Sequence, residues 1–267
     1  MIVMTAKKCG AKAPELLYAV SLGCPKNLVD TEMITGAFIN AGVRLTFEPE
    51  AASVYLINTC AFLASARAEA QEAIEEGAAW KCEHPGGKLI VAGCIVNHPD
   101  APRWKETFPE VDLWAGPTEL EKILPMPVCG NDVPLRLQLT LPHVAYLRIA
   151  DGCDNRCAYC LIPTLRGNKR SRTINSCVAE AKQLIEVGVK ELILIAQDTT
   201  AFGEKVKIFP VLSKLLKSSP ERSVTVSSIP ILPTIPMNLS ELWRRVKSSS
   251  LLWISLCSTS VIICLKG

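Results

Sequence analysis

Three cysteines lie close together near the middle of the chain, in the segment GCDNRCAYCLIP at residues 152–163. Their spacing, C-x3-C-x2-C, places Cys153, Cys157 and Cys160 in one short loop. Cysteine thiolates prefer soft metals, namely zinc, copper(I) and the irons of iron–sulfur clusters. A structural zinc ion takes four protein ligands, so a zinc site would also need His143 or a distant cysteine. With three cysteines, a cubane cluster keeps one iron open for a substrate. The spacing therefore indicates a catalytic iron–sulfur site, with zinc or inert thiols as the alternatives.

A second set of three cysteines follows three apolar runs in the first half of the chain. The runs LLYAVSL, SVYLINTC and KLIVAGC are typical of strands buried in a parallel sheet. Cys24, Cys60 and Cys94 stand at or just beyond their carboxyl ends. Ligands of open parallel sheets bind at that edge, so the three thiols are expected to converge there. Cysteine is also a small residue that is often buried in cores, and the residues alone leave inert thiols and a metal site equally open.

The elements between these runs must bring the cysteines together. Helices are expected over NLVDTEMITGAFINAG and from about residue 62 to residue 79, which gives a βαβαβ unit. After a proline-containing segment, VAYLRIAD and ELILIAQD are predicted strands, and INSCVAEAKQLIEVGVK is a predicted amphipathic helix. The three-cysteine loop directly follows the first of these strands, where (β/α) barrels carry their chemistry.

The predicted fold is therefore α/β: an amino-terminal βαβ open-sheet domain followed by an incomplete (β/α) barrel. Too few residues remain after the linker for a complete barrel, which needs roughly 200 or more. From about residue 204 the sequence loses its pattern of strands and helices, and we hypothesise a frameshift or a truncated reading frame there, which resequencing the locus would test. The expected parts are an amino-terminal domain at 1–124, a linker at 125–142, the start of the barrel at 143–203 and an atypical tail at 204–267.

Composition limits the classes of function. The chain has 267 residues, of which 12 are cysteine, and its formal net charge of +3 is too small to indicate nucleic-acid binding by itself. The amino-terminal segment lacks the pattern of a secretory signal, so we expect reduced thiols in the cytoplasm rather than disulfides. No apolar run reaches the roughly 18 residues of a membrane-spanning helix, so no membrane partner is expected.

The C-x3-C-x2-C motif and five segments, one of which contains its last two cysteines, resemble the methylthiotransferase family of radical S-adenosylmethionine enzymes. The segments are VSLGCPKNLVDTE, INTCAF, VAGC, CAYCLIPTLRGNKRSR and ELILIAQDTTAFG. Tyr159, before the last cysteine of the motif, is also similar to the pattern of that superfamily. The resemblance covers roughly residues 16–203. It implies S-adenosyl-L-methionine and two 4Fe–4S clusters as cofactors, an auxiliary cluster on Cys24, Cys60 and Cys94 and a radical-generating cluster on Cys153, Cys157 and Cys160.

The same resemblance implies an activity. Such enzymes methylate a sulfur held at the auxiliary cluster, form a 5′-deoxyadenosyl radical at the other cluster, and add a methylthio group to the substrate. The segments GCPKN and AQDTT resemble the branch that modifies the β-carbon of an aspartate in small-ribosomal-subunit protein twelve, with a flavodoxin- or ferredoxin-like electron donor. The alternatives are the branch that modifies an adenosine of transfer RNA, and a non-catalytic iron–sulfur-binding fragment.

Other residues near the motifs are candidates for supporting roles. Gln197 and Asp198 follow a predicted strand and are candidates for contacting S-adenosylmethionine, with an ordinary loop role as the alternative. Asn27 and Asn58 flank the amino-terminal cysteines and are candidates for positioning a cluster through hydrogen bonds. The basic segment RGNKRSR at 166–172 is expected to be a solvated loop, or to contact a cofactor carboxylate or an RNA-rich partner.

Overall fold

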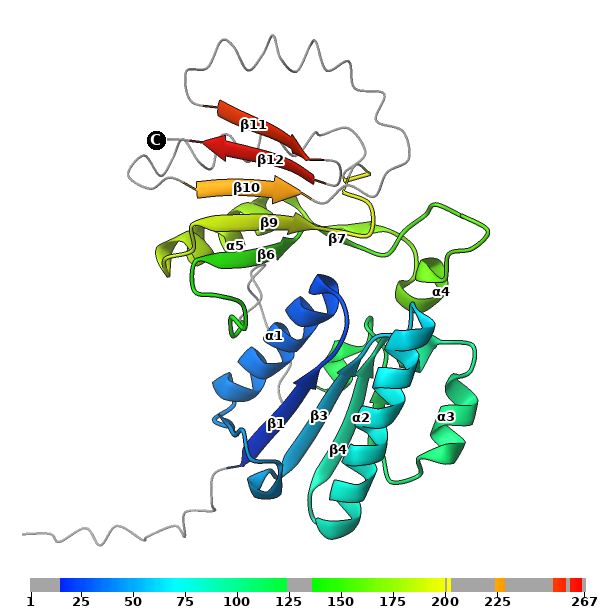
Figure 1. Ribbon diagram of the computed structural model, residues 1–267. Helices are drawn as coiled ribbons and strands as arrows, with labels where there is room; N and C mark the ends of the chain where they lie inside the picture. The colour runs from blue at the N-terminus through cyan, green and yellow to red at the C-terminus, as the bar shows by residue number, and fades with distance from the viewer. Residues whose placement is uncertain are drawn as a thin grey trace, which may run out of the picture.

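The computed structural model describes residues 15–123, 136–199 and 201–202, together with the strands at 224–228, 252–257 and 260–265. Residues 15–123 are called the first half below, and the described residues from 136 onward the second half. Each half is built on one five-stranded sheet (Figure 1). The expected linker falls partly, and the expected tail mostly, outside the described residues.

The sheet of the first half is parallel throughout, with strand order β2-β1-β3-β4-β5. Every residue of its central strand is buried, as expected for a strand covered by helices on both faces. The open parallel sheet predicted for the amino-terminal part is therefore present, and the predicted α/β class is confirmed. The strands are β1 (Leu16–Ser21), β2 (Arg44–Leu45), β3 (Val54–Thr59), β4 (Lys88–Gly93) and β5 (Leu113–Ala115).

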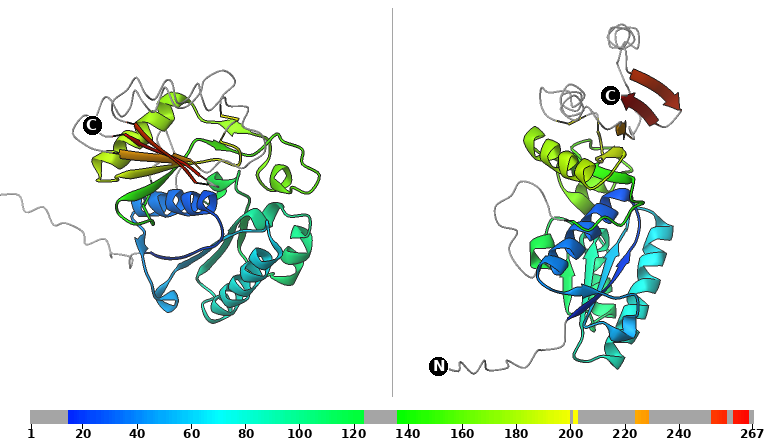
Figure 2. Two further views of the ribbon diagram at one scale, coloured as in Figure 1. Left: turned by 45° about the horizontal axis from the view of Figure 1, so that its top comes forward. Right: turned by 90° about the vertical axis from the view of Figure 1, so that its left-hand side faces the viewer.

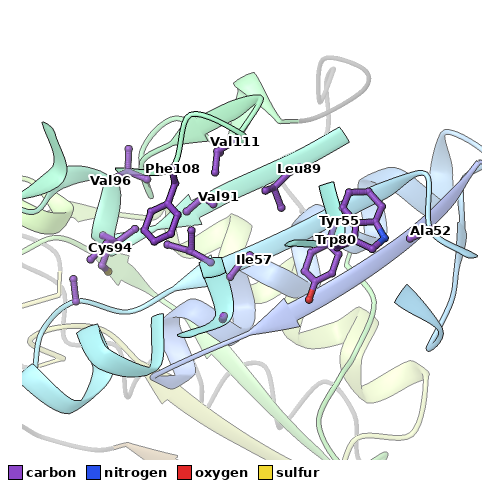
Figure 3. Packing of buried hydrophobic residues seen from close by; sticks show 14 of the residues in the cluster. Ala52, Tyr55, Ile57, Trp80, Leu89, Val91, Cys94, Val96, Phe108 and Val111 are labelled. Carbon is purple, nitrogen blue, oxygen red and sulfur yellow. The ribbon is translucent and has the colours of Figure 1, made fainter. Parts of the chain in front are cut away.

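Two long helices, α1 (Pro25–Asn40) and α2 (Ala64–Glu83), cover opposite faces of this sheet. Alternate residues of β3 show this, because Leu56 packs in the cluster that includes α1 and Ile57 in the cluster that includes α2. Figure 3 shows the cluster that includes α2. Shorter helical elements complete the first half: η1 (Pro49–Ala51), η2 (Cys94–Asn97), α3 (Ala101–Thr107) and η3 (Leu120–Lys122).

The sheet of the second half has strand order β11-β12-β10-β9-β6. Strands β6, β9 and β10 are parallel, whereas β12 runs antiparallel to β10 and to β11. The amphipathic helix α5 packs on β6 and β9, which is the β-loop-α-β order expected at the start of a barrel. The elements are β6 (Val144–Arg148), β7 (Ala150–Asp151), α4 (Ile162–Arg166), β8 (Arg170–Ser171), α5 (Ile174–Glu186), β9 (Glu191–Ile195), β10 (Val224–Ser228), β11 (Leu252–Cys257) and β12 (Ser260–Leu265).

The two halves meet at two places (Figures 1 and 2). Helix α1 contacts β1 on one side and β6 on the other, so it lies between the two sheets. Helix α4 of the second half contacts η2 of the first half. Among the described residues, none of the helices combines the length and the apolar character needed to cross a membrane.

Three element boundaries differ from the prediction, each for a local reason. Helix α2 runs four residues beyond 79, since buried Trp80 anchors its last turn by donating a hydrogen bond to the carbonyl of Pro49 at 2.7 Å. The strand expected over 144–151 is interrupted at Ile149, after which the chain leaves the main sheet and pairs with β8. Helix α5 ends before Gly188, whose φ of 107° does not continue a helix.

Candidate functional site

The cysteines of the first half follow three neighbouring strands. Cys24 lies in the turn between β1 and α1, Cys60 directly follows β3, and Cys94 directly follows β4. The strands are adjacent in the order β1-β3-β4, and their register aligns the residues that precede these turns. The three cysteines therefore occupy the same carboxyl edge of the sheet, as the sequence predicted.

Glycines with positive φ permit this close approach of the strand ends. Gly23, just before Cys24, has φ +91°, and a Cβ atom there would lie 2.3 Å from the Cβ of Cys60. Gly93, just before Cys94, has φ +93°, and a Cβ atom there would lie 2.4 Å from the carbonyl oxygen of Thr59. Any larger residue would both strain the backbone and push the cysteine-bearing turns apart.

Two buried asparagines brace the same edge. The side-chain amide of Asn27 donates to the carbonyls of Leu22 at 3.0 Å and Thr59 at 2.5 Å, which ties α1 to the ends of β1 and β3. The amide of Asn58 donates to the carbonyl of Asn27 at 2.8 Å. The carbonyl oxygen of the Asn27 side chain lies 3.8 Å from Sγ of Cys94. Asn27 thus contacts both the backbone that shapes the site and one of its thiols.

The three thiols are close enough to influence one another electrostatically. Burial raises the pKa of Cys94 to about 11, with Cys60 and Cys24 adding to the increase and Arg166 opposing it. Burial lowers the pKa of Lys26, whereas the nearby Cys24 works in the opposite direction. Metal binding requires thiolates, and the positive charge of Arg166 favours the charged form of the Cys94 sulfur.

The cysteines of the second half lie in a loop that is closed at its base by the β7–β8 pair. Cys153 is buried, Cys160 is half-buried and Cys157 is exposed. The amide of Cys153 donates to the carbonyl of Gly167 at 3.2 Å, and that of Cys160 to the carbonyl of Cys157 at 3.0 Å. Gly152 repeats the pattern of the first half, since its φ is +75° and a Cβ atom there would lie 2.2 Å from the carbonyl oxygen of Asn168.

Helix α4, which continues this loop, docks on the first half. The side chain of Leu165 is fully buried in the hydrophobic cluster that contains Cys94 and Ile95. The amide of Asn97 donates to the carbonyl of Leu165 at 2.9 Å. The two sets of cysteines are therefore joined by direct packing between the loop of one and the strand end of the other.

A chain of buried charges crosses the same junction. Arg166 donates to Oδ2 of Asp30 at 2.9 Å and to Oδ1 of Asp151 at 3.1 Å, and Arg148 pairs with the other oxygen of Asp30. Burial works to raise the pKa of Asp151, but the two guanidinium groups and a hydrogen bond from Gln197 hold that pKa below its usual value. Asp151 is therefore ionised at neutral pH and directly precedes the Gly152–Cys153 pair.

The prediction of a solvated loop for RGNKRSR is wrong for Arg166, whose residue surface is only 1% exposed. Sequence reasoning also missed Asp30, Arg148 and Asp151, because their partners lie far away in the chain. A signal existed for Asp30. It lies three residues after Asn27 and four residues before Ile34, and so on the same buried face of the helix. The repeated Gly-Cys pairs were a second signal, which pointed to the shape of the cysteine-bearing turns, because the glycine of each pair has a positive φ.

A second buried ion cluster lies beside the first. Nη1 of Arg136 lies 3.1 Å from Oε1 of Glu180 and 3.5 Å from Oε2 of Glu32. The backbone amide of Leu139 donates to the other oxygen of Glu32 at 2.8 Å, and Arg172 pairs with the other oxygen of Glu180. Burial raises the pKa of Glu32 despite the neighbouring guanidinium. Helix α1 is thus tied to the second half through Glu32 as well as through Asp30.

The two candidate cofactor contacts lie beside the cysteine loop. Gln197 is buried and donates to Oδ1 of Asp151 at 2.8 Å, while its own carbonyl oxygen has no hydrogen-bond partner. Asp198 accepts a hydrogen bond of 2.9 Å from Asn155, which lies within the loop. Both residues therefore contact the loop or its base, and their contact with S-adenosylmethionine stays a prediction.

A cavity of about 310 Å³ opens next to this junction. On one side it is lined by the segment that follows β5, including Glu121, and on the other by Arg148, Asp151, Arg170 and Arg172. Two of the three lining arginines are already paired with buried carboxylates, Arg148 with Asp30 and Arg172 with Glu180.

The chemistry of the donors fits iron–sulfur clusters. The eight cysteines whose side chains the structure describes are free thiols, and the six candidates form two sets of three soft donors. Within the described residues no three His, Cys, Asp or Glu side chains are grouped so that they could hold a single metal ion. A cubane is ligated at separate corners, which spaces its cysteines more widely than the ligands of one ion.

An open parallel sheet and the start of a second α/β unit, each carrying three cysteines beyond its strands, define the class of radical S-adenosylmethionine proteins with an additional cysteine site. Residues 147–256 match the radical SAM superfamily, and residues 17–116 match the family described as uncharacterized protein family UPF0004. The superfamily match therefore continues beyond residue 203, where the recognisable motifs end.

Similar proteins narrow the class further. The chain is 40% identical over 250 residues to the ribosomal protein uS12 methylthiotransferase RimO of Syntrophus aciditrophicus, covering 84% of this chain and 54% of that protein. It is 43% identical over 212 residues to the RimO of Elusimicrobium minutum, covering 75% and 49%. A solved radical S-adenosylmethionine methyltransferase, TsrM from Kitasatospora setae, has 13% identity and a TM-score of 0.48, covering 76% of this chain and 50% of that one.

The chain therefore combines a match to the UPF0004 family with a match to the radical SAM superfamily, and it is RimO-like over 75% to 84% of its length. It spans about half the length of the curated relatives that it matches.

Proposed function

We propose that this chain carries the cofactor-binding part of a radical S-adenosylmethionine methylthiotransferase that modifies an aspartate of ribosomal protein uS12. The observation that supports this most directly is the pair of cysteine sets, each at the carboxyl edge of an α/β unit, joined through α4. The names of the relatives, which describe uS12 methylthiotransferases, supply the substrate.

In this proposal Cys24, Cys60 and Cys94 hold an auxiliary 4Fe–4S cluster, and the three cysteines of the loop hold a second one. When bound, these clusters and S-adenosylmethionine would supply the radical and sulfur chemistry, which no side chain can provide. The chain itself ligates and positions. Free thiols at the eight cysteines whose side chains are described agree with a reducing compartment, and we place the protein in the cytoplasm with a flavodoxin- or ferredoxin-like electron donor. The loop's cysteines are Cys153, Cys157 and Cys160.

The residues around the loop would orient what binds there. Gln197 fixes the carboxylate of Asp151 at the base of the loop and keeps an unpaired carbonyl oxygen for a donor group of S-adenosylmethionine. Arg170 lines the adjacent cavity, where a guanidinium can bind a carboxylate in a bidentate manner. A carboxylate is present both in the cofactor and in the target aspartate, so this arginine would favour such groups over neutral ones.

The test is anaerobic reconstitution of the full chain, followed by iron and sulfide analysis. The wild-type chain is expected to bind about eight irons, and triple alanine variants of either cysteine set about four, because a cubane contains four irons. Reductive cleavage of S-adenosylmethionine should require the loop set. Iron binding without any cleavage would leave the chain as a cluster-binding protein alone, and one zinc without iron would contradict the proposal.

The substrate is tested separately. A strain that lacks the gene should lose the methylthio modification of uS12 in mass spectrometry of its ribosomal proteins, with its transfer RNA unchanged. Loss from transfer RNA instead would assign the chain to the adenosine-modifying branch.

A further inference from the structure

Arg166 is a charged side chain placed where three parts of the molecule meet. Its residue surface is 1% exposed although it lies at the end of the short helix α4. Nη2 donates to Oδ1 of Asn27 at 2.5 Å and to Oδ2 of Asp30 at 2.9 Å, and Nη1 donates to Oδ1 of Asp151 at 3.1 Å. Two of these partners belong to α1 of the first half, and the third stands at the base of the cysteine loop.

The same guanidinium also reaches the thiol of Cys94. The charge of Arg166 acts on this sulfur and opposes the effect of burial on the pKa of the thiol. Asn27, which accepts the hydrogen bond from Nη2, has the same oxygen atom 3.8 Å from Sγ of Cys94. One cation is therefore shared between the strand end that carries Cys94 and the base of the loop that carries Cys153.

A buried guanidinium is retained only where its partners are well placed, since an uncompensated buried charge is strongly unfavourable. The partners of Arg166 come from positions 139, 136 and 15 residues away in the chain, and the bonds to the two distant partners, Asn27 and Asp30, form only when the two halves are docked. Leu165 adds an apolar contact to the same interface, but a leucine fixes neither direction nor distance as a three-partner guanidinium does.

We propose that Arg166 is a positioning residue that holds the cysteine loop against the carboxyl edge of the first sheet and places a permanent positive charge beside the sulfur of Cys94. The first part of the proposal, that Arg166 holds the cysteine loop in place, concerns the chain alone. The second part, that Arg166 places a positive charge beside Cys94, rests on the proposed function, because the charge would act on the cluster that Cys24, Cys60 and Cys94 bind.

The first part is tested on the full chain without metal by hydrogen exchange and mass spectrometry. Arg166→Gln should accelerate exchange in the peptides that cover 24–32 and 152–167 together, because it removes the link between them. Arg172→Gln is the matched control, since it also removes a guanidinium from a buried carboxylate, Glu180, but its hydrogen-bond partners all lie in the second half. Arg166→Lys keeps the charge with fewer donors and should give an intermediate acceleration, which also covers the case in which the glutamine variant does not fold.

Unchanged exchange in both peptides of a folded Arg166→Gln chain would overturn the first part. Equal acceleration by Arg166→Gln and Arg172→Gln in these two peptides would also overturn it, because the effect would then be a general loss of stability.

The second part is tested by the midpoint potential of the iron-loaded chain in a background in which the three loop cysteines are alanine. Reduction adds negative charge to the cluster, so loss of a nearby cation should shift the potential to more negative values in Arg166→Gln. Arg166→Lys should shift it less, and Arg172→Gln should leave it unchanged. Equal potentials in the wild-type and Arg166→Gln chains would overturn the second part. A wild-type background that binds no iron would instead contradict the proposed function, with the hydrogen-exchange result standing independently.

Discussion

Alkaline pH should destabilise the metal-free chain through one thiol, that of Cys94. Its pKa rises from 9.0 to about 11 on folding, because the side chain is buried beside two further thiols. The folded chain thus favours the protonated thiol more strongly than the unfolded chain does. The stability that this contributes is fully present below pH 9 and is lost as the pH rises toward 11.

The size of the effect follows from the shift. A difference of about 2 pKa units at about 1.4 kcal/mol per unit gives about 3 kcal/mol, of which about 2 kcal/mol should be lost by about pH 10.5. Cys94 is 4% exposed, so solvent screening reduces this figure little. A loss of this size is a large part of the stability of an ordinary domain.

The assay is urea denaturation of reduced, chelator-treated chain at about pH 8 and about pH 10.5. Tyrosines, lysines and other cysteines also titrate in this range, so the quantity of interest is the difference between the wild-type chain and Cys94→Ala. The variant should lose about 2 kcal/mol less than the wild type between the two pH values. Cys82→Ala, which removes an exposed thiol, is the control and should follow the wild type. Equal losses in the wild type and Cys94→Ala would refute the burial of this thiol.

Three further predictions concern the docking and shape of the cysteine turns. Leu165→Ala should lower the free energy of unfolding by about 3 kcal/mol in chemical denaturation. Leu184→Ala, in the core of the second half, is the control and should cost about as much. A loss below about 1 kcal/mol for Leu165→Ala would mean that α4 is not docked. Gly93→Ala should reduce both stability and iron binding, whereas Gly86→Ala, with no atom within 4 Å of the added Cβ, should change neither. The lowered pKa of Asp151 contributes stability above the unfolded pKa that is lost as the pH falls through the folded value, so Asp151→Asn should show a flatter acid dependence of unfolding below the ordinary aspartate pKa of 3.8.

The placement of the first cysteine set could be predicted because its signals are local. The strand β3 is buried at every position and reads as a continuous apolar run, so its end at Thr59 is visible in the sequence. The parallel order then follows from the alternation of strands and helices. The short edge strands β2 and β5 could not be predicted, since two and three residues carry too little periodicity to be recognised.

The charged junction could not be predicted because its partners are far apart in the chain. Arg166 stands in a segment with four basic residues in seven, a composition that is typical of a solvated surface. Its burial depends on Asp30, which lies 136 residues earlier. Nothing within a window of local sequence links these two residues, and only the docking of the two halves makes the pair favourable.

Helix α1 explains why this junction is hidden in the sequence. A surface helix shows one apolar face toward a core and one polar face toward water. In α1 the apolar face, with Ile34, packs on the first sheet, but Asp30 beside that face and Glu32 on the opposite face are buried as well. These carboxylates meet arginines of the second half, so polar residues that normally indicate solvent here indicate a partner surface. Replacing such ion pairs by apolar residues often costs little stability, whereas leaving one partner alone is costly. The contribution of this interface is therefore specificity: a slipped or rotated docking would leave buried charges unpaired, and only one arrangement of the two cysteine sites avoids that.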